Sequence, residues 1–313
     1  MVENNQVSTT TPLFSIVVGV YNDWTPLEQC LRSLAQQANP PSFEVIVVDD
    51  GSKEVVPESI GQWIRYYPLT IVSQAHLGIS AARNRGVQIA RGAVLVFADA
   101  DCEFEGNCLS SLASAVGNST RHDYFQLHLR GDDSGPVGRA EELRLVTFQN
   151  HMLQPDGCIR YLNTAGFAIR RTKVNTAKGL FNPVARRAED TLLLADLLKR
   201  GELPFFVSDA SVQHVISLSF LECLRKDIHS AYLERTAYNI INSKGIRVRM
   251  SHRERLRMLL SAWKTSGQSS IGRLAWFVLV ARQMLQRMVS FTYWCFRVRP
   301  RLVRPGSRAA NSS

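Results

Sequence analysis

The sequence lacks a hydrophobic run long enough to cross a membrane, and its N-terminus lacks the apolar core of a signal peptide. From Ile271 onward the longest uninterrupted apolar run is Leu274 to Ala281, whereas a bilayer requires about 20 residues. Residues 1–12 are polar, so we expect them to be disordered and the protein to be cytoplasmic. The chain also lacks a C-x-x-C pair. Its six cysteines are scattered, several at apolar positions, which favours a reducing compartment.

Acidic residues are nearly absent from the C-terminal region. Residues 244–313 contain 15 Lys and Arg but a single acid, Glu254, whereas residues 1–243 contain 22 Lys and Arg against 26 Asp and Glu. The net charge of +10 therefore comes from the tail alone. A mildly acidic body joined to a basic tail predicts that the tail meets an anionic surface. Because no nucleic-acid-binding module is recognisable, we expect a membrane surface and no nucleic acid.

The sequence does contain an alternation of strand-like and helix-like segments. FSIVVGVY (14–21) and FEVIVVDD (43–50) are apolar, β-branched runs typical of buried parallel strands. The order repeats as LTIVSQ (69–74), a helix over 79–91 and AVLVFA (93–98). This alternation predicts an α/β fold, with an open, twisted, mostly parallel sheet and helices on both faces.

The first helix-like segment, TPLEQCLRSLAQQA, starts with residues suited to a helix N-terminus. Thr25 can cap it, Pro26 suits the first turn, and Glu28 completes a capping box. The apolar residues fall on one helical face, which we expect to pack on the sheet: Leu27, Cys30, Leu31 and Leu34.

Acidic residues follow two of the predicted strands. Asp49 and Asp50 end one, and Asp99 and Asp101 follow another. We expect all four at one rim, because the carboxyl ends of parallel strands meet at the same edge of a sheet. Side chains at i and i+2 of an extended segment face the same side, so Asp99 and Asp101 could share one Mg²⁺ or Mn²⁺. Helix capping and ordinary turns are the alternative roles.

The alternation weakens in the second half of the chain. DYFQLHL (123–129) and GFAIRR (166–171) are strand-like, and the segments between them, such as RGDDSGPVG, are predicted to be loops. A leucine-rich helix follows over 190–200, and a last strand, PFFVSDASVQHV, leads to His214. We therefore expect a second, mixed region of the sheet.

Several of these segments together resemble one enzyme family. FSIVVGVYNDWTPLEQCLRSLAQQ, FEVIVVDDGS, AARNRGVQIARG and VLVFADADCEF resemble, in this order and spacing, the N-terminal half of family 2 glycosyltransferases of the GT-A fold. NTAGFAIRR, AEDTLLLADLLKRG and VSDASVQHV resemble the acceptor side of that family. The resemblance implies a GT-A domain over 13–225, with a nucleotide-sugar half (13–105) and an acceptor half (106–225). A helical basic region follows over 226–313.

The resemblance also implies roles for the residues at the strand ends. Asp50 corresponds to the residue that binds the base of the donor, Asp49 would support its loop, and Tyr21 lies where the family places the mouth of the nucleotide site. Asp99 and Asp101 correspond to the DXD motif, which holds the diphosphate of a nucleotide sugar through a divalent metal, Mn²⁺ or Mg²⁺. In that motif Asp99 lies near the donor ribose and Asp101 is the main metal ligand.

The remaining implied site residues come from three other segments. Arg83 could grip two diphosphate oxygens with its planar guanidinium, or it could belong to a solvated helix face. His214 matches a histidine that completes the metal site in many relatives, and a structural role is the alternative. In the ED motif Asp190 corresponds to the general base and Glu189 orients the acceptor or the leaving group. Acids in a first helical turn are also favoured by the helix dipole alone.

One segment departs from the family pattern. Many relatives have a Gly-Gly-Phe-Asp-like turn before the ED motif, whereas this chain reads KGLFNP at 178–183. Arg186 and Arg187 follow, and they indicate either an anionic acceptor, such as a lipid-linked phosphate, or a solvated loop. We therefore expect a saccharide or lipid-linked acceptor.

The tail beyond Ile271 predicts a helix that lies in a membrane interface. The apolar residues expected to enter the interface are Leu274, Phe277, Val278, Ala281, Leu285 and Met288. Trp276, Tyr293 and Trp294 suit the headgroup region. The arginines expected to face anionic lipid are Arg297, Arg299, Arg301, Arg304 and Arg308. The alternative is a helix packed on the catalytic domain with a disordered basic end.

These features predict an inverting, metal-assisted glycosyltransferase at the inner face of a membrane. It would move a sugar from a nucleotide-diphospho-sugar to a hydroxyl of a polysaccharide, glycolipid or other glycoconjugate. A UDP-sugar is the expected donor. One alternative is a catalytically silent scaffold that binds nucleotide sugars. The other is a nucleotidyltransferase, which would normally have a Gly-rich phosphate loop where this chain reads Val20-Tyr21-Asn22-Asp23.

Overall fold

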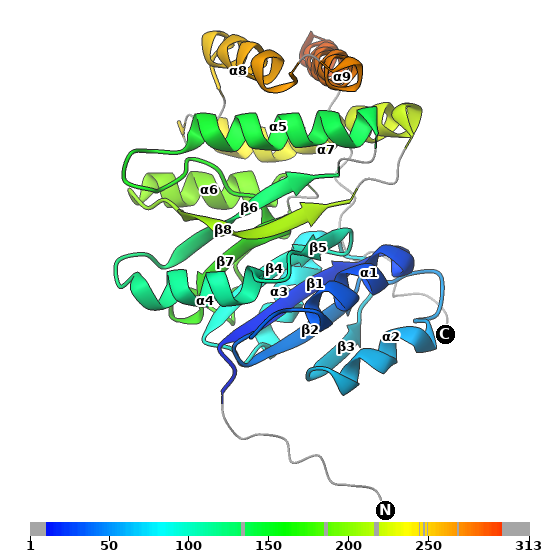
Figure 1. Ribbon diagram of the computed structural model, residues 1–313, viewed down its shortest axis with the longest axis vertical. Helices are drawn as coiled ribbons and strands as arrows, with labels where there is room; N and C mark the ends of the chain where they lie inside the picture. The colour runs from blue at the N-terminus through cyan, green and yellow to red at the C-terminus, as the bar shows by residue number, and fades with distance from the viewer. Residues whose placement is uncertain are drawn as a thin grey trace, which may run out of the picture.

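One eight-stranded sheet runs through the centre of the protein, with the strand order β3-β2-β1-β4-β7-β6-β8-β5. Helices cover both of its faces, and further helices form layers beyond it (Figure 1). The computed structural model describes residues 11–132, 135–184, 187–215, 219–243, 245–246, 248, 250–267 and 269–295.

The N-terminal half forms the parallel part of the sheet. Its elements are β1 (Phe14–Val20), α1 (Trp24–Ala35), β2 (Phe43–Asp49), α2 (Glu58–Gly61), η1 (Gln62–Arg65), β3 (Leu69–Ser73), α3 (Ile79–Ile89) and β4 (Val94–Asp99). β1 lies between β2 and β4, and β3 pairs with the outer side of β2, all in parallel. The predicted α/β architecture is therefore confirmed.

The second half adds mixed strands to the same sheet. Its elements are β5 (Cys102–Phe104), α4 (Cys108–Asn118), β6 (Tyr124–Gly131), α5 (Pro136–Met152), η2 (Thr164–Gly166), β7 (Phe167–Arg170), η3 (Arg171–Lys173), α6 (Glu189–Lys199) and β8 (Phe205–His214). β7 is antiparallel to both β4 and β6, whereas β6 and β8 are parallel. The short β5 pairs with the end of β8. The helix α5 begins within a segment that the sequence pattern predicts to be a loop.

Two hydrophobic clusters hold the helices on the sheet. One contains the predicted face of α1, whose members are at most 1% exposed: Leu27, Cys30, Leu31 and Leu34. The other lies on the opposite face, where α3 and α6 contribute Val87, Leu193 and Leu197. Burial of this area is the main force that fixes the sheet and therefore the ends of its strands.

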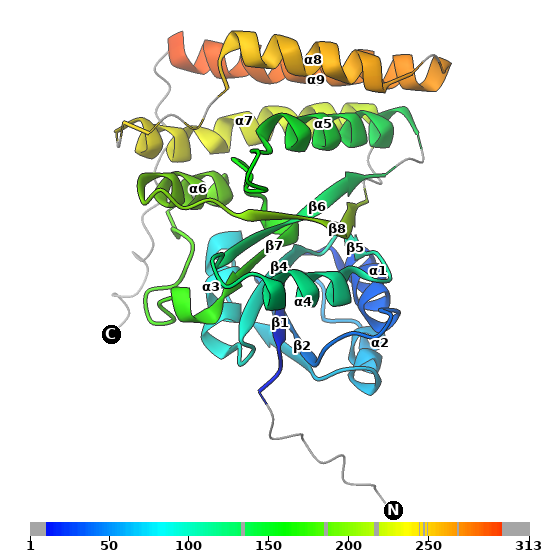
Figure 2. The same cartoon turned by 60° about the vertical axis from the view of Figure 1, so that its left-hand side comes forward.

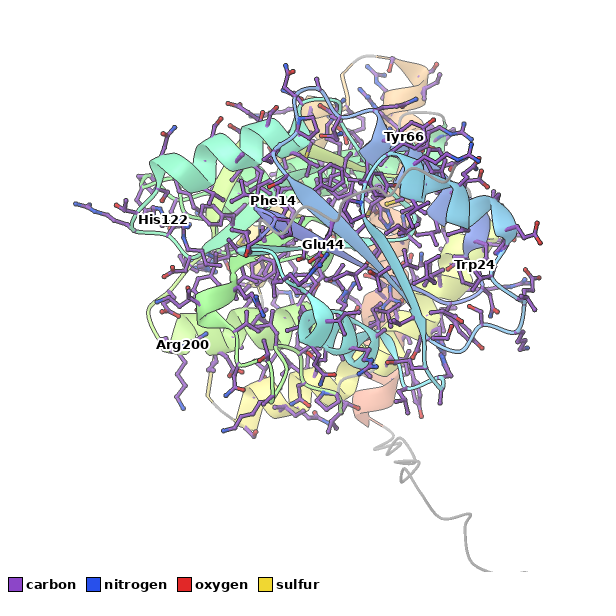
Figure 3. All side chains as sticks on the ribbon, turned by 90° about the horizontal axis from the view of Figure 1, so that it is seen from below. Phe14, Trp24, Glu44, Tyr66, His122 and Arg200 are labelled. Atoms are coloured by element: carbon purple, nitrogen blue, oxygen red, sulfur yellow. The ribbon has the colours of Figure 1, made fainter. Side chains whose placement is uncertain are left out.

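The start of α1 differs from the expectation. The helix begins at Trp24, and Asp23 is its N-cap residue without a side-chain capping bond. Trp24, labelled in Figure 3, is 5% exposed, so its packing in the core extends the helix beyond the predicted start. Glu28 accepts hydrogen bonds from Ser59 and Gln62 instead of closing a capping box.

Three helices follow the sheet: α7 (Phe220–Ser243), α8 (His252–Thr265) and α9 (Ser270–Cys295). α8 and α9 lie side by side as an outer layer over α5 and α7 (Figures 1 and 2). The predicted domain boundary at 225–226 falls within α7. Within the described ranges, no helix is both long and apolar enough to span a bilayer.

One side of α9 packs on the rest of the protein, as the alternative for the tail anticipates. Ala275 and Leu279 are buried against Ala140 and Leu143 of α5. Leu274, Phe277 and Met288 are more than half exposed, and the outer side is therefore apolar and in contact with solvent. Of the predicted residues, Arg186, the side chains of Tyr293 and Trp294, and the five tail arginines lie outside the described structure.

Candidate active site

The carboxyl ends of the central strands bring the predicted acidic residues to one rim. Val20 at the end of β1 pairs with Asp49 of β2, and the preceding Gly19 pairs with Asp99 of β4. The two acidic pairs therefore lie on either side of the same strand end, as expected. The opposite edge of the sheet also contains a buried acid, Glu44 (Figure 3).

Glu44 shows what a purely structural acid looks like in this protein. Its carboxylate accepts hydrogen bonds from the Ser15 hydroxyl at 2.6 Å and from the guanidinium of Arg91 at 2.7 Å. Burial opposes ionisation, but these bonds and the charge of Arg91 hold the pKa of Glu44 below its ordinary value. At the other edge Asp50, Asp99 and Asp101 line a cleft instead.

The loop after β3 wraps around Asp50. The carboxylate of Asp50, which is 3% exposed, accepts hydrogen bonds from the amides of Leu77 at 2.9 Å and Gly78 at 2.8 Å and from the side chain of Gln74 at 2.8 Å. Gly78 has a φ of +95°, a conformation that side chains with a Cβ rarely adopt. Asp50 thus fixes the shape of residues 74–78, of which 76–78 line the cleft.

Asp49 and Tyr21 have different places at this rim. Asp49 accepts a hydrogen bond from the amide of Ser52 at 2.9 Å, so it supports the turn after β2 from behind the cleft. The ring of Tyr21 lines the cleft and stacks on that of His76 with 4.2 Å between centroids. Nδ1 of His76 lies 3.0 Å from the Asp50 carboxylate. Their contacts with a nucleotide remain a prediction.

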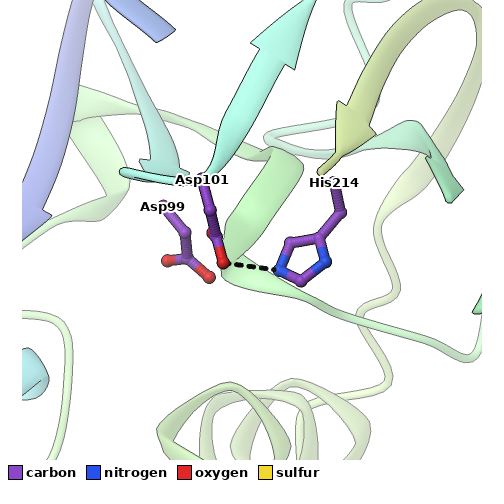
Figure 4. A group of neighbouring side chains, drawn as sticks. All are labelled: Asp99, Asp101 and His214. Carbon is purple, nitrogen blue, oxygen red and sulfur yellow. Dashed lines mark ion pairs between the residues drawn. The ribbon is translucent and has the colours of Figure 1, made fainter. Parts of the chain in front are cut away.

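Asp99, Asp101 and His214 form a group that could hold a metal ion. Their ligand atoms all lie within 4.8 Å of one another (Figure 4). His214 is brought there by the pairing of β5 with β8, in which it lies opposite Cys102. Nε2 of His214 is 3.3 Å from the Asp101 carboxylate, and within the described structure its buried Nδ1 has no hydrogen-bond partner. Two carboxylates and an imidazole form a donor set suited to Mn²⁺ or Mg²⁺.

The electrostatics of this group favour its charged form. Burial opposes ionisation of Asp101, but the hydrogen bond and charge of His214 hold the pKa of Asp101 below its ordinary value. Burial disfavours the protonated form of His214, but the hydrogen bond and charge of the Asp101 carboxylate outweigh this effect. The net result is a raised pKa of His214. In the absence of a metal, Asp101 and His214 therefore form an ion pair, and a metal ion would have to displace the proton of His214 in order to bind there.

Arg83 connects Asp99, at the end of β4, to the ED motif at the start of α6. Its guanidinium contacts the carboxylates of both Asp99 and Glu189, and it lies 5.7 Å from the ring centre of Phe181. The side chain is 2% exposed, so the alternative of a solvated helix face is wrong for Arg83. Its predicted contact with a diphosphate remains a prediction.

Glu189 and Asp190 open α6 at the inner end of the cleft. Glu189 is 6% exposed, and Asp190 is partly buried beside it. Burial, and then the charge of Glu189, raises the pKa of Asp190 to about 7, against the opposing hydrogen bonds of Thr191 and the charge of Arg83. A carboxyl with a pKa near neutrality is suited to accept a proton at physiological pH.

A cleft of about 790 Å³ joins these groups. The predicted residues that line it are Tyr21, Asp50, Arg83, Asp99, Asp101, Glu189, Asp190 and His214. Its volume is within the range of small-molecule sites, roughly 300–1,000 Å³. Arg187 also lines the cleft and is exposed. The sequence indicates for it either contact with an anionic acceptor or a place in a solvated loop.

The opposite wall of the cleft comes from helices whose contribution the sequence pattern did not reveal. α5 supplies Glu141 and Arg144, α7 supplies Lys226 and Asp227, and α9 supplies Arg282. The proline at the start of α5 was the available signal for that helix. Its inward face is partly polar, so it has no clear hydrophobic stripe.

Ion pairs join these three helices. Arg282 of α9 donates to Asp227 of α7 at 2.7 Å and lies 3.6 Å from Glu141 of α5. Glu141 also pairs with Arg144. Burial opposes its ionisation, but the charge of Arg144, followed by that of Arg282, lowers the pKa of Glu141 to about 2. These charged groups neutralise each other and hold α9 as a fixed wall.

Comparison with known proteins agrees with this architecture. Residues 15–176 match the family described as Glycosyl transferase family 2. The chain therefore belongs to glycosyl transferase family 2. Among curated relatives, Glycosyltransferase AglE of Haloferax volcanii is 34% identical over 99 residues, which cover 31% of this chain and 33% of AglE. The similarity thus spans about a third of that relative.

Solved structures share the fold over nearly the whole chain. The mannosyltransferase PcManGT from Pyrobaculum calidifontis, in complex with GDP-Man and Mn²⁺, superposes with a TM-score of 0.62 and 16% identity, covering 93% of this chain and 89% of PcManGT. TarS 1-349 of S. aureus, in complex with UDP, gives a TM-score of 0.54 and 18% identity, covering 90% of this chain and 91% of that one. The expected GT-A fold is therefore confirmed.

Proposed function

We propose that this protein is an inverting glycosyltransferase that uses a nucleotide-diphospho-sugar, with UDP-sugar as the first candidate. The observation that carries the proposal is the convergence, in one cleft, of three side chains that could hold a metal ion and a carboxyl with a pKa of about 7. Family membership supports the same reaction class. The bound nucleotide and metal of PcManGT and the UDP of TarS support the donor class.

In this proposal the residues of the rim bind the donor. The ordered loop around Asp50 and the ring of Tyr21 form the wall for the nucleotide. Asp99, Asp101 and His214 would hold Mn²⁺ or Mg²⁺, which would neutralise charge on the departing diphosphate. Arg83 keeps Asp99 and Glu189 at a fixed separation across the cleft.

Asp190 would supply the general base. Its carboxylate takes the proton from an acceptor hydroxyl, whose oxygen then forms a bond to the anomeric carbon while the bond from that carbon to the diphosphate breaks. Attack from the face opposite the leaving group inverts the anomeric centre. The raised pKa of Asp190 supports this role, because the base is then strong enough to take the proton and still ionised above pH 7.

The proposal includes a saccharide or lipid-linked acceptor and a cytoplasmic, membrane-peripheral location. The exposed Arg187 at the acceptor side of the cleft and the basic C-terminal region support it. A catalytically silent binder with the same cleft is the alternative that an experiment must separate.

Hydrolysis of a panel of UDP- and GDP-sugars in the presence of Mn²⁺ tests the function. An enzyme releases sugar slowly from one donor even without an acceptor, and Asp101→Ala abolishes that release. Tight donor binding with no hydrolysis or transfer by any preparation would instead identify a binding protein. A matched control is Asp209→Ala, which changes an exposed aspartate on the same strand as His214.

A further inference from the structure

The outer side of α8 and α9 carries an unusually large set of exposed apolar side chains. We call this set the outer hairpin face: Leu256, Leu260, Trp263, Ile271, Leu274, Phe277, Met284, Met288 and Phe291. Each is more than 40% exposed, from 41% for Trp263 to 66% for Met288. On each helix the spacing keeps them on one side. Contiguous apolar surface of this kind marks an interaction site.

The orientation of this face is fixed by what lies behind it. Ala275 and Leu279 pack on α5, and the indole N–H of Trp276 donates to the carbonyl of Leu259 at 2.9 Å, which ties α9 to α8. Arg282 is bound to Asp227 of α7. The apolar side chains therefore point outward because the inner side of each helix is already occupied, and not because the helices are loosely attached.

The charge around the outer hairpin face indicates what covers it. Exposed cations flank the apolar side chains: Arg253, Arg257, Lys264, Arg273 and Arg287. In the sequence from 252 to 292 the single acid is Glu254, and its carboxylate accepts a hydrogen bond from the amide of Ser251 at 2.6 Å. A second copy of the chain docked face to face would bring the same cations together. An anionic surface with an apolar interior complements both the cations and the apolar residues.

We propose that the outer hairpin face docks on an anionic lipid bilayer. The hairpin forms one end of the molecule, opposite the N-terminal strands, so the whole face can meet a flat surface (Figure 2). Trp263 and Phe277, whose rings lie 6.4 Å apart, would enter the interface together with the leucines of both helices.

Docking would also place the cleft at the membrane. The inner side of α9 supplies Leu279, Arg282, Gln283 and Gln286 to the cleft wall. One helix therefore contacts lipid on one side and the site on the other. The docking specifies which surface would give the membrane-peripheral location of the proposed function, and the further consequence, that the acceptor is taken up from the bilayer, rests on the proposed transfer reaction as well.

Sedimentation of the full-length protein with vesicles tests the docking. The test variant combines Leu260→Gln, Leu274→Gln and Met288→Gln, none of which lines the cleft. The control combines Val55→Gln, Ile64→Gln and Tyr66→Gln, which are at least as exposed and lie in the N-terminal half. On phosphatidylglycerol–phosphatidylcholine vesicles we expect the test variant to lose at least about tenfold in affinity while the control binds like the unmodified protein.

Three further measurements can overturn parts of the docking proposal. Pure phosphatidylcholine vesicles, or high salt, should weaken binding of the unmodified protein, and equal binding to neutral vesicles would overturn the anionic-lipid assignment. Equal vesicle binding by the test variant, with circular dichroism showing that it is folded, would overturn the docking face. Sedimentation velocity without lipid that shows a dimer dissociated by the test variant would assign the face to a second copy instead.

Donor hydrolysis separates this inference from the proposed function. The test variant should hydrolyse a UDP-sugar at the rate of the unmodified protein, because its three changes lie outside the cleft. Loss of vesicle binding together with intact hydrolysis supports both the docking and the enzyme. Vesicle binding that depends on the outer hairpin face, without hydrolysis of any donor, would retain the docking and reject the proposed function.

Discussion

The two walls of the cleft are built in different ways. The wall at the sheet edge consists of side chains at and just beyond the ends of strands β2 and β4. Strand pairing holds Asp99, and backbone hydrogen bonds hold Asp50 and Asp101. The helical wall consists of side chains from α5, α7 and α9, which are held by ion pairs such as Arg282 with Asp227. In the proposed function the first wall would offer ligands to a donor, whereas charges in the second largely satisfy each other.

This difference predicts different consequences of mutation in the two walls. At the sheet edge, a substitution should abolish chemistry with little loss of stability, because the strands are fixed by the core. In the helical wall, a substitution should mainly reduce stability, because each charge compensates another that is buried.

The largest effect is expected for Asp101→Ala. Removal of a main metal ligand should reduce Mn²⁺-dependent turnover of a UDP-sugar by about a thousandfold or more. The urea midpoint should change little. Turnover assays with and without EDTA measure the effect, and Asp209→Ala serves as the control. Undiminished activity of the variant would remove the metal role from this residue.

The second effect concerns the pH dependence of Asp190. The pKa of Asp190 is raised to about 7, so the group is protonated below pH 7 and cannot accept a proton there. We expect kcat/KM to fall as the pH decreases through about 7, approaching tenfold per pH unit, and to level off above it. Asp190→Asn should reduce kcat by about a hundredfold or more, abolish this decrease at low pH and leave donor affinity intact. If the variant still shows the decrease, the titrating group is another residue.

The raised pKa of Asp190 also makes the free energy of unfolding depend on pH. Asp190 binds its proton more tightly in the folded than in the unfolded chain, so its contribution to stability is fully present below the unfolded pKa of 3.8 and is lost progressively as the pH rises from there through about 7. Asp190→Asn should therefore be more stable than the unmodified protein above pH 7.

The helical wall is tested by Asp227→Leu. This change leaves Arg282 without its main partner, and we expect the free energy of unfolding to fall by about 3 kcal/mol in urea titrations. The double variant Asp227→Leu, Arg282→Met should recover much of the loss, since no unpaired charge remains. Glu105→Gln, which breaks an exposed pair with Arg130, should change stability by less than about 0.5 kcal/mol. Equal losses from Asp227→Leu and Glu105→Gln would contradict the buried ion-pair account.

The smallest effect is expected at the loop that surrounds Asp50. Gly78→Ala places a Cβ on a residue with a φ of +95°, which should cost about 1 kcal/mol and weaken UDP binding. Space is not the problem, since no atom lies within 4 Å of the added Cβ. Gly106→Ala is the control, because its Cβ is equally free of contacts and its φ is not positive. A neutral Gly78→Ala would show that the loop adapts.

The sequence predicts the sheet-edge wall well because its signals are local. The apolar runs that form β2 and β4 end in the acids themselves, and the buried face of α1 follows a simple periodicity. The start of α1 could not be predicted, since burial of Trp24 outweighs local capping chemistry. Similarly, the sequence gives no local sign that Arg83 is buried between Asp99 and Glu189, which lies 106 positions away.

The helical wall is harder to predict for a related reason. α5 buries Glu141, Thr147 and Gln149 on its inward face, so polar residues interrupt the pattern by which an amphipathic helix is found. The partners of these side chains are distant in sequence, and Arg282 reaches Asp227 across 55 positions. Such contacts depend on how whole helices pack. Local sequence patterns therefore do not reveal that these side chains form a wall of the cleft.

Calorimetric titration of UDP is the most direct test of the shared donor site. The unmodified protein should bind UDP in Mn²⁺ and at least about tenfold more weakly in EDTA. Asp101→Ala should show only the weaker binding in either condition, and Asp50→Ala should lose affinity in both. Tight UDP binding that is unaffected by EDTA and by both substitutions would show that the acids of β2 and β4 do not form one nucleotide site.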